Sequence, residues 1–158
     1  MDQHNLLNIV NDNDENTSDL VIDKQLCFAM YSATNAVIRA YRPILKALDL
    51  TYPQYLVMMV LWGNNGINVK ALGHKLHLDS GTLTPLLKRL EQKNLLTRER
   101  SEKDERVREI FLTPSGSRIK SEAEDIPNAM LCKAKLPLDE LLTMKESCER
   151  LLANLNAQ

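Results

Sequence analysis

The most reactive side chains of this sequence are the thiols of Cys27, Cys132 and Cys148. An odd number of cysteines at this low density is not the pattern of a scaffold held together by disulfides. We therefore expect a protein of the reducing cytoplasm, where cysteine chemistry is transient. A thiol reacts as its thiolate, so the surroundings of each cysteine decide whether it is reactive.

Cys27 falls on a predicted helix together with two tyrosines. Tyr31 and Tyr41 follow it by 4 and 14 residues, and at 100° per residue the three side chains share one face. Fourteen residues span about 21 Å along a helix axis, which is too far for a phenol to reach. If Tyr41 contacts a Cys27 thiol, we expect the thiol of a second copy of the chain. The spacing alone is equally consistent with Cys27 as a small, buried hydrophobic residue.

The basic residues are concentrated in one part of the chain. The net charge is −1, but residues 1–23 hold six acids and no Lys or Arg, so the remainder carries +5. Between Lys70 and Arg100 there are seven basic residues and three acids. This excess is typical of a surface that binds a polyanion, although a solvated helix face gives the same count.

Two histidines lie close enough in the sequence to face a common metal ion. His74 and His77 are three residues apart, but no acid or cysteine nearby completes a ligand set. We expect no metal and no cofactor.

Composition favours a helical protein. The 158 residues suit one domain, and the few glycines (5) and aromatic residues (4%) disfavour strand-rich sandwiches and glycine-loop nucleotide folds. No apolar run approaches the ~18 residues that a membrane span requires. The first residues carry no Lys or Arg before an apolar stretch, so no secretory signal is expected.

The middle of the chain predicts a winged helix-turn-helix. A helix from about Asp23 to Ala47, which Pro43 should kink or break, is followed by a capping box, Thr51-x-x-Gln54, that begins a second helix. Two short helices come next, the second with a leucine stripe on one face. Small, hydroxyl-bearing and basic side chains point away from that stripe, as in a helix that enters a major groove: Gly81, Thr84, Pro85, Lys88 and Arg89. Two short strands, Leu95–Arg100 and Val107–Leu112, complete a charged hairpin.

The terminal helices have apolar stripes without a core of their own. Thr113-Pro114 predicts a helix that runs to about Cys132 and is disturbed at Pro127, and Pro137 opens the last helix. A symmetric dimer buries such stripes. The fold class we expect is mainly α with a small β-hairpin (α+β): a winged helix-turn-helix whose terminal helices form a dimerisation domain. The expected division is a mobile acidic arm (residues 1–20), a dimerisation region (21–50 and 113–158) and a DNA-binding domain (51–112).

Four stretches at matching spacing carry a family resemblance. They are LCFAMY (Leu26–Tyr31), LTYPQYLVMMVLW (Leu50–Trp62), LDSGTLTPLLKRLE (Leu78–Glu91) and RSEKDERV (Arg100–Val107). The segment Leu26–Thr113 resembles the MarR family of bacterial transcription regulators, and within it the organic hydroperoxide resistance regulators, the OhrR branch. The chain is most similar to the two-cysteine kind.

The resemblance implies a role for each matching position. Cys27 corresponds to the peroxide-sensing cysteine, and Cys132 to the resolving cysteine. Tyr31, Tyr41 and Tyr52 correspond to residues of the sensing pocket, the last two as phenols that hydrogen-bond the thiolate. The implied DNA contacts lie on the reading helix and at the wing tip: Ser80, Gly81, Thr82, Thr84, Lys88, Arg89, Asp104 and Arg106.

The function expected from these observations is a cytoplasmic repressor and not an enzyme. A homodimer would bind double-stranded DNA at a palindromic operator, and an organic hydroperoxide would release it by oxidising Cys27. We expect no membrane partner. Two alternatives stay open: a MarR-type repressor released by a small aromatic ligand, and a thiol peroxidase. The choice of Cys132 over Cys148 as the resolving thiol is also open.

Overall fold

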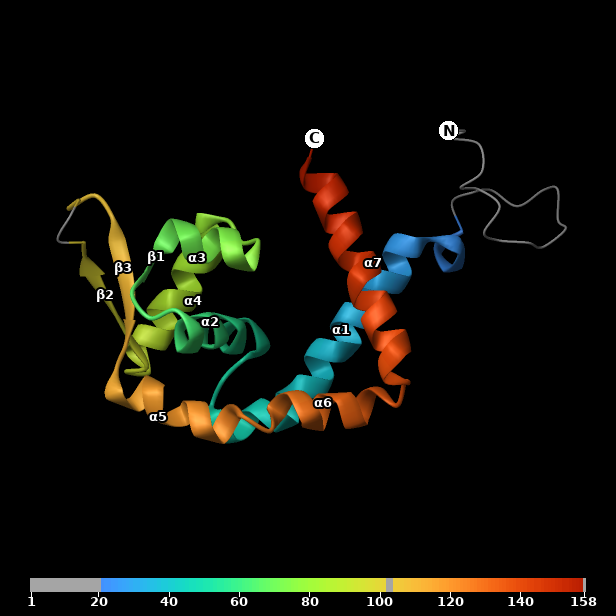
Figure 1. Cartoon of the computed structure of the whole chain (residues 1–158), viewed down its shortest axis with the longest axis horizontal. Helices are drawn as coiled ribbons and strands as arrows, with labels where there is room; N and C mark the ends of the chain where they lie inside the picture. Colours follow the sequence, from blue (N-terminus) through green and yellow to red (C-terminus); the bar gives the residue numbers. More distant parts are fainter. Residues whose placement is uncertain (1–20, 102–103, 158) are drawn as a thin grey trace, which may run out of the picture. The chain divides into compact units, whose positions relative to one another are not determined.

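The structure is a computed structural model that describes residues 21–101 and 104–157 (Figure 1). The predicted acidic arm, residues 1–20, lies outside these ranges. The chain forms two units, residues 1–39 and 40–158. Helix α1 (Leu26–Leu45) begins in the first and ends in the second, and single turns of 3-10 helix flank it at Ile22–Lys24 and Lys46–Leu48. The helix ends two residues after Pro43, close to its predicted end.

The second unit contains the predicted winged helix-turn-helix. Its elements are α2 (Tyr52–Gly63), β1 (Ile67–Asn68), α3 (Val69–Leu76), α4 (Ser80–Gln92), β2 (Leu96–Arg100) and β3 (Arg108–Leu112). The hairpin pairs Leu96 with Leu112 and Arg100 with Arg108. The two-residue strand β1 pairs with the other edge of β3, so the antiparallel sheet has three strands in the order β1-β3-β2. The expected fold class is confirmed, and the sequence had missed β1.

Leucines on one side of α4 hold this helix on the core of the unit. Leu83, Leu87 and Leu90 are buried against α2, α3 and the sheet, whereas Leu86 is only partly buried. Burial of one stripe leaves the opposite face of α4 in solvent.

One pair of helices resembles a membrane segment in length and composition. No single helix within residues 21–101 and 104–157 is long and apolar enough to cross a bilayer. The stretches Leu26–Leu48 and Tyr52–Gly63 pass the same test together, with a bend of 63° between them.

Three helices follow the hairpin: α5 (Pro114–Ala123), α6 (Ile126–Ala134) and α7 (Leu138–Asn156). The single helix predicted up to Cys132 is therefore two helices. The break comes before Pro127, which lies in the first turn of α6, where the missing proline N–H costs no helix bond. Within the described chain no residue of α7 is buried, and several of its large apolar side chains are exposed, among them Leu155 at 62%.

Candidate nucleic-acid interface and thiol site

A tight turn and a capped start fix the position of α4. A Cβ on Gly73 would lie 2.9 Å from the backbone oxygen of Leu78, so this close turn favours glycine. His77 ends α3 in the left-handed region (φ 53°). The carboxylate of Asp79 then accepts the Thr82 backbone N–H at 2.8 Å, and this hydrogen bond lowers the pKa of Asp79. The first turn of α4 is thus held by its own side chains.

The predicted reading face of α4 is exposed along its length. It comprises Ser80, Gly81, Thr82, Thr84, Lys88 and Arg89. Thr82 donates its hydroxyl to Asp79 Oδ2 at 3.2 Å, and Thr84 donates to the Ser80 carbonyl at 2.7 Å. Because a hydroxyl has one donor and two acceptor positions, these threonines offer oxygen lone pairs and methyl groups to an approaching molecule.

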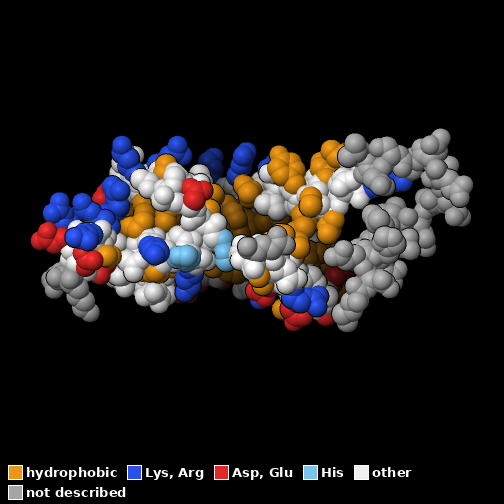
Figure 2. Space-filling model, turned by 90° about the horizontal axis from the view of Figure 1, so that it is seen from above, with side chains coloured by type: hydrophobic (Ala, Val, Ile, Leu, Met, Phe, Trp, Pro, Cys, Tyr) orange, Lys and Arg blue, Asp and Glu red, His pale blue; other side chains and the backbone are white. Residues whose placement is uncertain are grey.

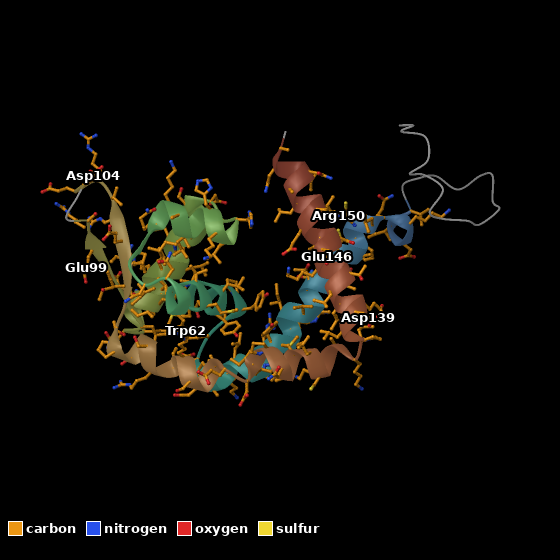
Figure 3. All side chains as sticks on the ribbon, in the orientation of Figure 1. Trp62, Glu99, Asp104, Asp139, Glu146 and Arg150 are labelled. Carbon is orange, nitrogen blue, oxygen red and sulfur yellow. The ribbon has the colours of Figure 1, made fainter. Side chains whose placement is uncertain are left out.

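The tip of the hairpin is shaped by Asp104 (Figure 3). Its Oδ1 accepts the Arg106 backbone N–H at 3.0 Å, and its carbonyl accepts the Val107 N–H at 2.9 Å. Both Asp104 and Arg106 are exposed. The acid therefore fixes the backbone from which the arginine projects.

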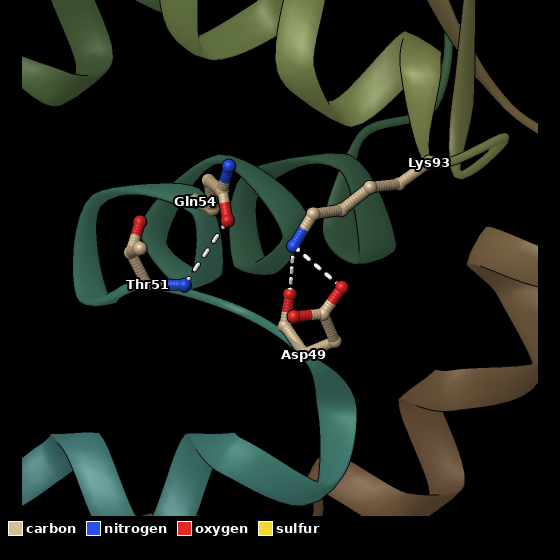
Figure 4. Close-up of polar contacts among 4 residues, drawn as sticks. All are labelled: Asp49, Thr51, Gln54 and Lys93. Atoms are coloured by element: carbon tan, nitrogen blue, oxygen red, sulfur yellow. Dashed lines mark hydrogen bonds and ion pairs between the residues drawn. The ribbon is translucent and has the colours of Figure 1, made fainter.

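Two basic residues near α4 have acidic partners. Arg98 Nε donates to Glu91 Oε2 at 3.0 Å, and this bond lowers the pKa of Glu91. Lys93 Nζ lies 2.9 Å from Asp49 Oδ2 and also binds the Asp49 carbonyl (Figure 4). The positive charge of this region therefore rests mainly on the other five basic residues: Lys70, Lys75, Lys88, Arg89 and Arg100.

An aromatic cluster joins α1, α2 and α5. The rings of Tyr41 and Tyr52 lie 4.5 Å apart, and Tyr55 lies 6.1 Å from both Tyr41 and Trp62. Trp62 Nε1 donates to the Gly116 carbonyl at 2.9 Å. Burial raises the pKa of all three phenols, and for Tyr41 the neighbouring tyrosines add to it. The phenols therefore remain neutral and keep an O–H to donate.

The structure brings together two of the three predicted pocket tyrosines, Tyr41 and Tyr52. Sequence reasoning missed Tyr55 and Trp62, although their spacing of 3 and 10 residues from Tyr52 is helical and signals a shared side of α2. Tyr31 is 67% exposed.

All three cysteines are exposed free thiols. Cys27 belongs to the first unit, with Tyr31, whereas Cys132 on α6 and Cys148 on α7 belong to the second. The described residues contain no cluster of three His, Cys, Asp or Glu side chains able to hold a metal ion.

Comparisons with known proteins define the class. Residues 39–123 match the family model described as transcriptional regulator SarA/Rot. The organic hydroperoxide resistance transcriptional regulator of Bacillus subtilis is 44% identical over 85% of this chain and 92% of its own length. Reduced AbfR bound to DNA aligns with a TM-score of 0.70 and 36% identity over 85% of this chain and 93% of that one. A disulfide-formed AbfR aligns with a TM-score of 0.60 and 34% identity over 83% of this chain and 92% of that one. AbfR is a protein of Staphylococcus epidermidis.

These matches and the fold define a winged-helix regulator of transcription. The chain belongs to the SarA/Rot family of transcriptional regulators. Its resemblance to the organic hydroperoxide resistance regulators is confirmed by the Bacillus relative. The Bacillus relative is a transcriptional regulator, which agrees with the expectation of a regulator and not of an enzyme.

Proposed function

We propose that this chain is a homodimeric, DNA-binding transcriptional repressor that releases its operator when an organic hydroperoxide oxidises Cys27. The observation that carries the proposal is the exposed reading face of α4 beside a wing whose Arg106 is held by Asp104. This arrangement occurs on a scaffold 36% identical to AbfR, which has been observed bound to DNA.

Each element has a distinct part in DNA binding. The first turns of α4 enter the major groove, where Thr84 accepts hydrogen bonds and contacts thymine methyl groups. Lys88 and Arg89 neutralise phosphates. Arg106 reaches from the wing into the adjacent minor groove, whose negative potential attracts arginine. A twofold dimer presents two such units to a palindromic operator.

The phenols of Tyr41 and Tyr52 activate the thiol of Cys27. Cys27 and Tyr41 lie in one helix, α1, and the fourteen residues between them correspond to about 21 Å. The acceptor of the phenol hydrogen bond is therefore Cys27 of the partner subunit. A hydrogen bond to a charged acceptor contributes ~1.5–3 kcal/mol, so two phenols favour the thiolate strongly over the thiol.

Oxidation then proceeds in two balanced steps. The thiolate attacks an oxygen of the hydroperoxide, the O–O bond breaks, and the products are a sulfenic acid on Cys27 and an alcohol after protonation. Cys132 of the partner subunit attacks the sulfenic sulfur, a disulfide forms, and water leaves. A disulfide requires Cα atoms within ~7 Å. Drawing α6 toward the start of α1 rotates the reading helices out of register with the two half-sites. The disulfide-formed structure of AbfR supports the disulfide step.

A DNA-binding assay on reduced protein, repeated after treatment with an organic hydroperoxide, tests the proposal. We expect binding before treatment, loss afterwards, and recovery with a thiol reductant. Cys27→Ser retains a hydroxyl of similar size but cannot form a sulfenic acid, so it should bind DNA and ignore the peroxide. Release of Cys27→Ser at the wild-type dose would exclude this thiol as the sensor. Release by an aromatic compound without oxidation would favour a ligand-controlled repressor.

A further inference from the structure

Helix α3 presents a row of three side chains to the groove between α3, α4 and the hairpin. Lys70, His74 and His77 all line this groove, and all three are exposed. Lys70 and His74 are four residues apart and share one side of α3, and His77 is the C-cap residue that follows the helix. In Figure 2 the histidine side chains of the described chain lie on the same face as several Lys and Arg side chains. The row is outside the predicted DNA-contact set.

The acids that line the groove already have partners. On α4, the carboxylate of Asp79 binds the Thr82 N–H, and Glu91 binds Arg98 of β2. Each hydrogen bond favours the ionised carboxylate, and neither acid lies on α3. Arg98 therefore offsets the charge of Glu91, whereas Asp79, two residues after His77 in the sequence, keeps its negative charge.

The remaining charges in the groove are positive. Lys70 comes from α3, Arg106 from the wing and Arg108 from β3. The two histidines also lie in the last turn and at the C-cap of α3, where the exposed carbonyls favour a cation. A ligand that satisfies this row must carry several negative charges along a line, as a nucleic-acid backbone does.

We propose that the Lys70–His74–His77 row is a second DNA-backbone contact and that operator binding tightens as pH falls because both imidazoles take up protons on binding. This inference rests on the proposed DNA-binding function. An ordinary histidine titrates near pH 6.5, and a phosphate beside the ring stabilises its protonated form. The gain in affinity for DNA is therefore present at low pH and lost as the pH rises. Phosphodiesters do not titrate in this range.

Linkage sets the size of the effect. One proton taken up on binding changes the dissociation constant by at most about tenfold per pH unit. Because proton uptake is incomplete both at pH 6 and at pH 8, we expect about fivefold tighter binding per histidine at pH 6 than at pH 8. Each protonated ring also neutralises a phosphate, so the slope of log affinity against log salt should steepen by about 0.9 per histidine at the lower pH.

The experiment measures affinity of the reduced protein for a mixed-sequence duplex at pH 6 and pH 8, at constant low ionic strength. Such a duplex reports backbone contacts without knowledge of the operator. The variants are His74→Gln and His77→Asn, because asparagine tolerates the left-handed backbone of position 77. Lys75→Gln is the matched control: it removes a charge from α3 but lies outside the groove.

We expect each histidine variant to lose about half of the logarithmic pH effect and the double variant to lose nearly all of it. Thermal unfolding checks that the variants fold. Lys75→Gln should retain the full pH effect whatever its affinity. Equal wild-type affinity at both pH values, or an undiminished pH effect in the double variant, would overturn the inference alone. A reduced protein that binds DNA at neither pH overturns the proposed function as well.

Discussion

Replacing Gly116 with alanine should destabilise the junction between the winged helix and the C-terminal helices. A Cβ at this position would lie 2.0 Å from the Leu95 carbonyl oxygen, where ordinary contact begins at 3.4 Å. Backbone atoms must therefore move apart by about 1.4 Å, the difference between those distances. Gly116 also donates its N–H to Thr113 Oγ1 at 3.0 Å and accepts from Trp62 Nε1 at 2.9 Å. A shift of that size breaks both hydrogen bonds.

The cost follows from these contacts. Overpacking a tight contact costs about 1–3 kcal/mol. Loss of the Thr113 cap and of the Trp62 hydrogen bond costs about 1 kcal/mol each. Alanine returns about 1 kcal/mol because it is the better helix former. We expect the free energy of unfolding to fall by about 2–4 kcal/mol.

Urea unfolding of wild type and variant at one protein concentration measures this loss. Trp62 is the single tryptophan, so its fluorescence reports the altered site directly. Gly63→Ala is the matched control, since a Cβ there meets nothing within 4 Å. The control should be neutral or slightly stabilising. A Gly116→Ala protein as stable as wild type, with unchanged Trp62 emission, would show that α5 does not approach Leu95 this closely.

The remaining predictions concern DNA contacts and thiols. Lys88→Ala should weaken binding to all duplexes alike and lower the salt slope by about one, whereas Arg106→Ala should lose most on A/T-rich flanks; unchanged affinity in both would contradict the assigned interface. Peroxide-treated wild type should run as a covalent dimer on a non-reducing gel, absent in Cys132→Ser and present in Cys148→Ser; the reverse pattern would make Cys148 the resolving thiol. Tyr41→Phe should slow the peroxide reaction at pH 7 about threefold, measured by stopped flow, because a lost hydrogen bond of ~1.4 kcal/mol lowers the thiolate-to-thiol ratio about tenfold, from about 3 to about 0.3; an unchanged rate would remove this phenol from the mechanism.

Local patterns predicted helix α4 well. Asp79 is the cap that its position before a leucine stripe indicated, and the buried leucines leave the expected residues exposed. Likewise, the Thr51 N–H binds Gln54 Oε1 at 3.0 Å, as the capping-box spacing predicts (Figure 4). Both features involve residues three or four positions apart, so sequence spacing is sufficient to find them.

Strand β1 had no such signal. Two residues are too few for an alternating pattern, and Ile67–Asn68 becomes a strand only by pairing with β3, more than forty residues later. Gly66, with φ 83°, lets the chain turn into that pairing, and its N–H donates to the Ile110 carbonyl at 2.9 Å. A glycine before an isoleucine does not indicate this role, because the partner strand defines it.

The charge around the proposed DNA contacts depends on such distant contacts as well. A count along the sequence treats Lys93 and Lys88 alike, yet Lys93 binds Asp49, 44 residues earlier, whereas Lys88 stays exposed on the reading face. Arg98 is likewise held by Glu91 across the corner between α4 and β2. Both pairs hold the C-terminal end of α4 against neighbouring elements, and paired charges attract phosphate less. We therefore expect the strength of DNA binding to depend on which basic side chains the fold leaves without a nearby acid, and less on the total number of basic residues.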